Sequence, residues 1–344
     1  MQSTAVVMAV YHPNPDFLDQ QIRSVAAQID TDVILYAVIA DTVSQDLVKS
    51  LCRHAGLTFV STLPATPQTT VDAFEMGLKA ALDGPCTHIA LCDQDDIWHP
   101  DRLQQGLSAL VQSGAAMVHS DASVIDADGS EIAPSVFKME HRKKTASVAD
   151  LLYLNTVTGM TVLLTRQLAQ QALPFPKQDG THFYHDLWLA LVARAQDGLA
   201  FVDKPLVRYR KHGGNVVGPG VNRQSPGFAE RMAAYALSRY LATELHSRFP
   251  AIQGTTAFRR SIRLGLPHAA RAISAAYRRD MRRAQIASWA CLAVWARWIW
   301  AIGMGAPQGV QNARNQFDTK VFALSPGCPP TPRAQADQPT KRRA

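Results

Sequence analysis

The first hundred residues alternate between short apolar runs and longer segments that are apolar on one face only. The short runs are typical of strands buried on both faces, since such strands lack a polar side. Residues 4–10, 33–40, 57–61 and 87–91 are predicted to be strands of this kind. Apolar residues spaced three or four apart predict helices over residues 16–29, 47–55 and 69–82. This alternation indicates an α/β fold with a parallel sheet covered by helices.

The pattern is less regular beyond residue 100. Helices are predicted over residues 101–113, 148–154 and 185–195, and strands over 116–119, 158–164 and 200–202. We expect a turn at residues 126–129 and a mobile loop over residues 134–147. Residues 208–215 are predicted to end the first domain in a Gly-rich loop.

A different composition begins near Phe228, where the pattern is helical to about Gly303. Ile286–Met304 is apolar and holds four tryptophans, but Arg297 interrupts it. Because an arginine near the centre of a membrane span is costly, a spanning helix is the less favoured interpretation. Residues 324–344 are Pro-rich and polar, which predicts disorder.

We therefore expect three parts: a domain over residues 1–222, a basic, Trp-rich helical extension over 223–305, and a mostly disordered tail over 306–344. The net charge of +7 is unevenly spread over them. Residues 1–245 carry a net charge of −6, and residues 246–344 carry +13. Such asymmetry suggests a polyanionic partner for the basic part. An anionic membrane surface is the expected one, and no nucleic acid is expected.

Cysteine usage and the N-terminus indicate the compartment. The five cysteines are odd in number and show no Cys-x-x-Cys spacing, so free thiols in a reducing compartment fit better than disulfides. The first residues lack the basic start and long apolar run of a secretion signal. A cytoplasmic location is therefore predicted, with peripheral attachment to the cytoplasmic face of the inner membrane.

The strongest chemical signal is the acidic stretch Cys92–Trp98, in which Asp93, Asp95 and Asp96 fall within four residues. It follows a predicted buried strand, and open α/β sheets bind their ligands where strands end. Carboxylates this close repel one another unless a cation or hydrogen bonds offset the repulsion. Mg²⁺ or Mn²⁺ carrying a diphosphate is the obvious candidate, because Mg²⁺ takes few protein carboxylates and completes its shell with phosphate and water. The alternative is a solvated acidic turn that caps the next helix.

The order of several motifs carries more information than any one of them. Asp41 ends the second predicted strand, and DQDDIWHPDRL follows the fourth from residue 93. HDLWLAL at 185–191 opens a later helix, and YRKHGGNVVG at 209–218 lies in a closing loop. This order resembles that of the family 2 inverting glycosyltransferases, and the closing loop is similar to that of their rhamnosyltransferase-like members. The resemblance spans roughly residues 4–218.

The resemblance implies a Rossmann-like, nucleotide-sugar-binding domain of the GT-A type. On the donor side it implies that Asp41 contacts the nucleotide base and that Asp93 contacts the ribose or the donor sugar. Ala9 and Tyr11, where the first strand ends, are assigned to the same nucleotide-sugar site.

For the metal and the chemistry, the resemblance implies that Asp95 holds the divalent cation, with His212 near the metal or the diphosphate. Asp186 would be the catalytic base. These roles agree with elementary chemistry. A bound cation stabilises a departing nucleoside diphosphate, and a carboxylate can take the proton of an attacking hydroxyl.

Two departures from the family pattern leave the identity of the nucleotide open. The run around Asp41 is Ala40-Asp41-Thr42-Val43, without the usual second acidic residue and glycine. Phe74-Glu75 replaces the usual Arg-Asn pair of the third helix.

Each assigned residue also has a plainer interpretation. Asp186 would be a helix N-terminal acid favoured by the macrodipole, and His212 a loop histidine without a function. Asp41 would be a strand-end turn residue, and Asp121 is favoured as a turn residue over an acceptor contact. Trp98 and Trp188 are expected to pack in the core rather than to bind sugars.

The sequence thus favours an inverting, metal-dependent glycosyltransferase that moves a sugar, with rhamnose from a dTDP donor as the candidate, onto a cell-surface polysaccharide or lipid-linked saccharide. One alternative is a nucleotidyltransferase that makes an activated sugar. It is disfavoured because Tyr11–Pro15 has neither the glycine nor the Lys or Arg of a phosphate loop. The other alternative is a non-catalytic, membrane-associated adaptor.

Overall fold

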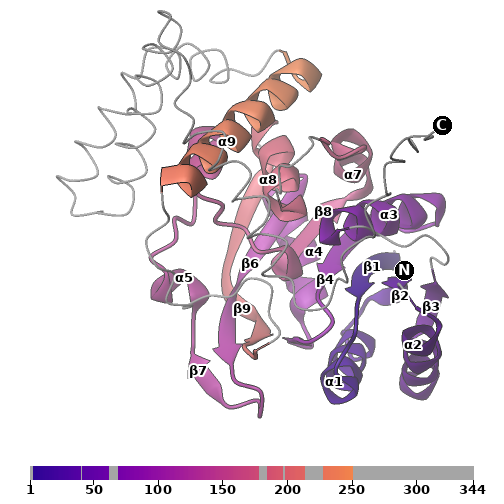
Figure 1. Cartoon of the computed structure of the whole chain (residues 1–344). Coiled ribbons are helices and arrows are strands. Elements are labelled where there is room, and N and C mark those ends of the chain that lie inside the picture. Colours follow the sequence, from indigo (N-terminus) through magenta and orange to yellow (C-terminus); the bar gives the residue numbers. More distant parts are fainter. Residues whose placement is uncertain are drawn as a thin grey trace, which may run out of the picture. The chain divides into compact units, whose positions relative to one another are not determined.

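The fold is built on one mixed sheet (Figure 1). The structure is a computed structural model that describes residues 3–39, 41–61, 69–177, 184–196, 198–213 and 228–250. Within these residues the sheet has nine strands. Eight of them follow the order β3-β2-β1-β4-β8-β6-β9-β5, and the ninth, β7, pairs with β6 outside this path.

The first four strands confirm the predicted parallel arrangement. They are β1 (Ser3–Val10), β2 (Asp32–Ile39), β3 (Thr58–Ser61) and β4 (His88–Cys92). β1 lies between β2 and β4, and all neighbouring pairs among the four are parallel. Their carboxyl ends therefore meet at one edge of the sheet, called the carboxyl edge below.

The parallel arrangement of the first four strands does not extend to the whole sheet. The strand β8 (Val162–Thr165) runs antiparallel to both of its neighbours, β4 and β6 (Met117–Ile125). An apolar strand buries the same side chains whichever way it runs, so its composition does not reveal its direction. β8 begins at the carboxyl edge, directly after the 3₁₀ turn Gly159–Thr161, and therefore runs away from that edge. A further antiparallel strand, β5 (Ile97–Trp98), pairs with β9 and was not predicted.

Two strands are much longer than predicted. β6 spans Met117–Ile125 instead of 116–119, and β9 spans Leu199–Arg210 instead of 200–202. The two pair in parallel along their length, and the hydrogen bonds between them extend through polar residues that an apolar pattern does not mark. The last residues of β9 are therefore strand, and the prediction that a loop begins at residue 208 is wrong.

The loop predicted over residues 134–147 is also wrong in part. β7 (Glu131–Ala133) precedes it, and the short helix α5 (Val136–Met139) lies inside it. Asp121 of β6 explains the helix, because its carboxylate accepts hydrogen bonds from the Ser135 hydroxyl and from the backbone N–H of Phe137. Asp121 is thus a buried strand residue that holds α5, and its interpretation as a turn residue is wrong.

Helices cover both faces of the sheet (Figure 1). One face carries α1 (Pro15–Ala26), α2 (Thr42–Ala55), α4 (Arg102–Ser113) and α5. The other carries α3 (Thr70–Asp83), α6 (Val148–Tyr153), α7 (Arg166–Ala172), α8 (His185–Ala195) and α9 (Phe228–Arg248). Local sequence explains several boundaries. Asn14 and Thr69 cap α1 and α3 with their side chains, and Gly56 ends α2 with a φ of 68° that glycine adopts without strain.

The core confirms that both tryptophans pack inside the protein. Trp188 of α8 is fully buried, and its indole N–H donates to the carbonyl of Ala172 at 2.9 Å. Trp98 is buried in the cluster on the other face.

α9 lies beyond the boundary predicted at residue 222, yet it packs on α6 and α8. Leu241, Ala242 and Leu245 are buried in the same core as the sheet. The boundary itself and the parts predicted over 251–344, including Ile286–Met304, lie outside the described residues, and the three-part division stays a prediction. Among the helices that the structure describes, none has the length and apolar character to cross a membrane.

Candidate active site

The acidic turn is anchored to the first strand by Gln94. Its side-chain oxygen accepts a hydrogen bond from the Tyr11 N–H at 2.9 Å, and its side-chain nitrogen donates to the Tyr11 carbonyl at 3.0 Å. The two bonds join the ends of β1 and β4, which are neighbours in the sheet. The turn therefore has a fixed position at the carboxyl edge.

Arg102 holds the same turn from inside the protein. Its guanidinium lies over the Trp98 ring at 3.5 Å and donates to the carbonyls of Leu91, Met160 and Val162. Both Trp98 and Arg102 come from the motif that starts at Asp93, so this motif supplies its own support as well as its carboxylates. Burial lowers the pKa of Arg102 to about 9, which leaves it charged at neutral pH.

The carboxylates of the turn differ in their surroundings. Asp96 is fully buried; one of its oxygens accepts from the backbone N–H of Arg210 at 2.9 Å. Burial and the charges of Asp95 and Asp93 hold its pKa well above the usual range. Asp93 and Asp95 are half-buried and follow the end of β4 at the carboxyl edge. Burial, Asp95 and Asp186 together raise the pKa of Asp93 to about 7.

His212 meets Asp95 across 117 positions of sequence. Its Nε2 lies 2.7 Å from the Asp95 carboxylate, and both side chains are partly exposed. β9 delivers the histidine, because this strand ends at Arg210, close to the acidic turn. The contact with Asp95 therefore argues against the interpretation of His212 as a loop histidine without a function.

Asp186 lies at the start of α8 and is only 9% exposed. Three donors hold its carboxylate: the Asn155 side-chain amide at 2.9 Å, the Gly159 N–H at 3.0 Å and the N–H of Leu187. Burial nevertheless raises its pKa to about 6. The carboxylate is thus oriented by its neighbours and titrates close to neutral pH, which suits a general base.

Gly159 must be a glycine for Asp186 to be held in this way. A Cβ atom on Gly159 would lie 2.7 Å from the Nε2 of His185. His185 itself is buried and stacks on Phe74 with ring centroids 3.8 Å apart. Burial lowers the pKa of His185 to about 3, so the ring is neutral. A side chain at position 159 would collide with the buried His185 ring, so glycine allows the backbone N–H to stay within hydrogen-bond distance of Asp186.

Asp41, Ala9 and Tyr11 lie at the same edge of the sheet. Asp41 is the N-cap of α2; its carboxylate accepts from the Ser44 N–H at 2.7 Å and from the Ser44 hydroxyl at 2.8 Å. These hydrogen bonds lower its pKa. Ala9 is a half-buried residue of β1, and the Tyr11 side chain is 54% exposed. The cap gives Asp41 a structural role, and its nucleotide contact stays a prediction.

The residues at the turn fit a divalent cation that brings ligands of its own. Within the described part of the chain, no group of three or more His, Cys, Asp or Glu side chains is spaced to enclose a metal. Asp95 and His212 instead offer an oxygen and a nitrogen side by side. The second oxygen of Asp96 is buried without a hydrogen-bond partner among the described residues. Mg²⁺ commonly uses one or two carboxylates and completes its coordination with phosphate and water.

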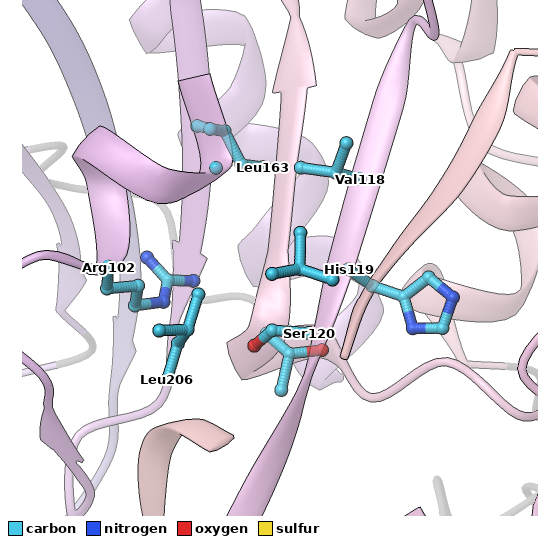
Figure 2. Close-up of a pocket in the computed structure, with 9 residues that line it drawn as sticks. Arg102, Val118, His119, Ser120, Leu163 and Leu206 are labelled. Atoms are coloured by element: carbon cyan, nitrogen blue, oxygen red, sulfur yellow. The ribbon is translucent and has the colours of Figure 1, made fainter. Parts of the chain in front are cut away.

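A small cavity is lined by residues of α4, β6, β8 and β9, Arg102 among them. Figure 2 shows Arg102 beside Leu206 at this cavity, with the His119 ring pointing away from them. Its lining is mostly apolar and contains none of the carboxylates described above. The candidate site is the carboxyl edge and not this cavity.

Comparison with solved structures reveals the fold. The residues 1–349 of S. aureus TarS, in complex with UDP-GlcNAc, superpose with a TM-score of 0.52 at 12% identity, covering 94% of this chain and 88% of that one. The chain has the fold of the GT-A glycosyltransferases. It spans 40% of a longer TarS structure, which it matches with a TM-score of 0.49.

Sequence comparison agrees with this glycosyltransferase fold. The dTDP-rhamnosyl transferase RfbG of Shigella flexneri is 22% identical over 225 residues, which cover 62% of this chain and 75% of that protein. No protein-family model matches the chain. Both comparisons are consistent with the resemblance to family 2 glycosyltransferases that the motif order indicates, and they support a glycosyltransferase.

Several residues that build the site were not predicted. Asn155 and Gly159 orient Asp186, Gln94 joins the acidic turn to β1, and Arg210 contacts the backbone of that turn. They act through contacts between segments that are distant in the sequence, and a single sequence holds no signal for those. For Gly159, its place just before an apolar strand was the only hint.

Replacing Asp186 by asparagine should stabilise the folded protein at neutral pH. The folded carboxyl has a pKa of about 6 against an ordinary value of 3.8, so the stability present below pH 4 is lost as the pH rises toward 6. The shift corresponds to roughly 3 kcal/mol, an order-of-magnitude figure. Denaturant unfolding at pH 4 and at pH 7.5 should show a gain for Asp186→Asn only at pH 7.5. An equal effect at both pH values would contradict the assigned ionisation.

Proposed function

We propose that this chain is a metal-dependent glycosyltransferase that moves a sugar from a nucleoside-diphosphate donor to an acceptor hydroxyl. One observation carries the proposal. Asp93, Asp95, Asp186 and His212, which come from three distant segments, gather at the carboxyl edge of a GT-A glycosyltransferase sheet. Ligands of open α/β sheets bind at this edge.

Asp186 is proposed as the catalytic base. The acceptor hydroxyl must lose its proton as it attacks the anomeric carbon, and the Asp186 carboxylate takes that proton. Its hydrogen bonds to Asn155 and Gly159 leave it oriented, and its raised pKa makes it a stronger base than an exposed aspartate. Direct displacement at the anomeric carbon would invert its configuration.

The acidic turn is proposed to bind the donor. Asp95 and His212 would hold a Mg²⁺ or Mn²⁺ ion, which when bound offsets the charge of the departing diphosphate. The charges of both Asp95 and Asp186 raise the pKa of Asp93, so Asp93 interacts electrostatically with the proposed metal ligand and with the proposed base. It would contact the ribose or the donor sugar. Asp41, Ala9 and the exposed Tyr11 would line the nucleotide site.

The finer assignment rests on the relative. Its name supports dTDP-rhamnose as the donor, and we extend this to a cell-surface polysaccharide or lipid-linked saccharide as the acceptor. Direct transfer assays can test this assignment. dTDP-rhamnose should be consumed faster than UDP-GlcNAc, and the opposite preference would contradict the donor identity.

A screen of nucleotide sugars by thermal shift, with and without Mn²⁺, tests the function as a whole. A donor present at 100 times its Kd should add about 2.7 kcal/mol of stability in the presence of the metal. In Asp95→Ala the metal-dependent part of this gain should vanish while the fold remains. Asp203→Ala is the matched control, because Asp203 pairs with Lys144 at the surface. Full metal-dependent binding by Asp95→Ala would show that the turn has been misassigned.

Kinetics of Asp186→Asn test the proposed base. We expect kcat to fall roughly 10²–10⁴-fold while donor affinity stays nearly unchanged, because a base acts mainly in the transition state. In the wild type, kcat/KM should rise with pH through about 6 as Asp186 ionises. A loss of donor affinity as large as the loss of rate would instead make Asp186 a donor-binding or structural residue.

Peripheral membrane attachment is proposed from the sequence of the basic C-terminal part, since basic faces attract anionic lipids and tryptophans favour the headgroup region. We expect high salt or carbonate to release the protein from membrane fractions. Extraction by detergent alone would show that a segment such as Ile286–Met304 spans the membrane.

The two alternatives predict different products. A nucleotidyltransferase would release pyrophosphate from a nucleoside triphosphate and a sugar phosphate, whereas a glycosyltransferase releases a nucleoside diphosphate. A non-catalytic adaptor would turn over neither. Assays for the two phosphate products with the same purified protein therefore separate all three.

A further inference from the structure

Arg210 is the last residue of β9 and is only 1% exposed, yet it contacts three separate segments of the chain. Its Nε donates to the carbonyl of Asp95 at 2.9 Å. One terminal nitrogen donates to the carbonyl of Ala127 at 2.9 Å, and the other donates to the Gln20 side chain at 2.7 Å. The guanidinium thus joins the acidic turn, the turn after β6 and the helix α1.

The backbone of Arg210 adds a fourth connection, because its N–H donates to the buried carboxylate of Asp96 at 2.9 Å. Side chain and backbone together bind two consecutive residues of the acidic turn, Asp95 and Asp96. These contacts are charge-assisted or buried, and such bonds are the strong ones.

His212 follows two residues later and reaches the Asp95 carboxylate at 2.7 Å. Arg210 binds the backbone of Asp95, and His212 lies against its side chain, so the two contacts hold the same residue from two sides. The distance between His212 and Asp95 therefore depends on how β9 is fastened to the turn.

Phe17 of α1 packs near both Arg210 and His212. Its ring lies 4.5 Å from the Arg210 guanidinium carbon and 5.3 Å from the centroid of the His212 ring. The guanidinium and the imidazole thus share one aromatic neighbour, in addition to their shared partner Asp95.

We propose that Arg210 is a positioning residue for the donor site: it fixes His212 against Asp95, so that both can bind a divalent cation carrying a nucleoside diphosphate. The role rests on the proposed function, because it assumes that Asp95 and His212 hold the cation. The planar guanidinium is needed, since a lysine ammonium cannot reach the three segments in the same fork geometry.

The test measures Mn²⁺ binding, alone and with dTDP or UDP, from the electron paramagnetic resonance signal of free Mn²⁺. Residues around metal ligands typically contribute 10- to 100-fold to affinity, so Arg210→Lys should weaken binding by about that factor. Gln20→Ala and Phe17→Leu remove single supports and should weaken binding by smaller factors. The matched control is Arg208→Lys, because Arg208 is an exposed arginine of the same strand whose guanidinium donates to the carbonyl of Gly129. The Mn²⁺ affinity of Arg208→Lys should stay within about twofold of the wild-type value.

A double-mutant cycle separates positioning from a general loss of structure. If Arg210 acts through His212, then Arg210→Lys should cause little further loss of Mn²⁺ affinity in a His212→Ala background. An equal loss in both backgrounds would overturn the proposal. Should Arg210→Lys fail to fold, the same cycle with Gln20→Ala and Phe17→Leu decides, and full additivity there overturns it.

The outcome also distinguishes this role from the proposed function. A wild-type protein that binds no Mn²⁺ with either nucleotide would overturn the proposed metal-dependent donor site, and the positioning role with it. Normal wild-type binding that Arg210→Lys leaves unchanged would overturn the positioning role alone.

Discussion

The repulsion between carboxylates at the carboxyl edge is the constraint on which the rest of this structure depends. Asp93, Asp95 and Asp186 lie close enough for their charges to influence one another, and burial strengthens that influence. A fold keeps such a group only if donors surround it or a cation joins it. Hydrogen-bond donors are visible around Asp186, and the Nε2 of His212 lies within hydrogen-bond distance of the Asp95 carboxylate, where a cation could also bind.

The reversed strand β8 makes part of this compensation possible. Because β8 runs opposite to β4, it starts at the carboxyl edge, and the segment before it brings Asn155 and Gly159 to Asp186. A parallel strand at this place in the sheet would have started at the other edge. The orientation of the candidate base thus depends on the unexpected direction of β8.

The pairing of β6 with β9 places His212 beside Asp95. It extends β9 as far as Arg210, which binds the acidic turn and carries His212 to Asp95. The site retains destabilising features, among them the raised pKa of Asp186 and the buried carboxylate of Asp96. Proteins commonly keep such features where chemistry requires them, and the packed core on both faces of the sheet offsets their cost.

The sequence by itself determined the local elements and the acidic turn. The first four strands, the start of α3 at Thr69, the end of α2 at Gly56 and the whole of α8 follow from periodicity, capping residues and apolar runs, which act within a few residues. For the same reason it predicted that Asp93 and Asp95 end a strand and that Asp186 opens a helix.

Only the tertiary structure decided the direction of β8, the length of β6 and β9, and the partners of each site residue. An apolar strand is equally buried in either direction, and polar residues such as Ser120 and Ser123 enter β6 because hydrogen bonds to β9 hold them there. The contacts of Asp186 with Gly159, and of Asp95 with Arg210, are made through backbone atoms. Every residue carries those atoms, so the sequence does not mark which ones will meet until the sheet has assembled.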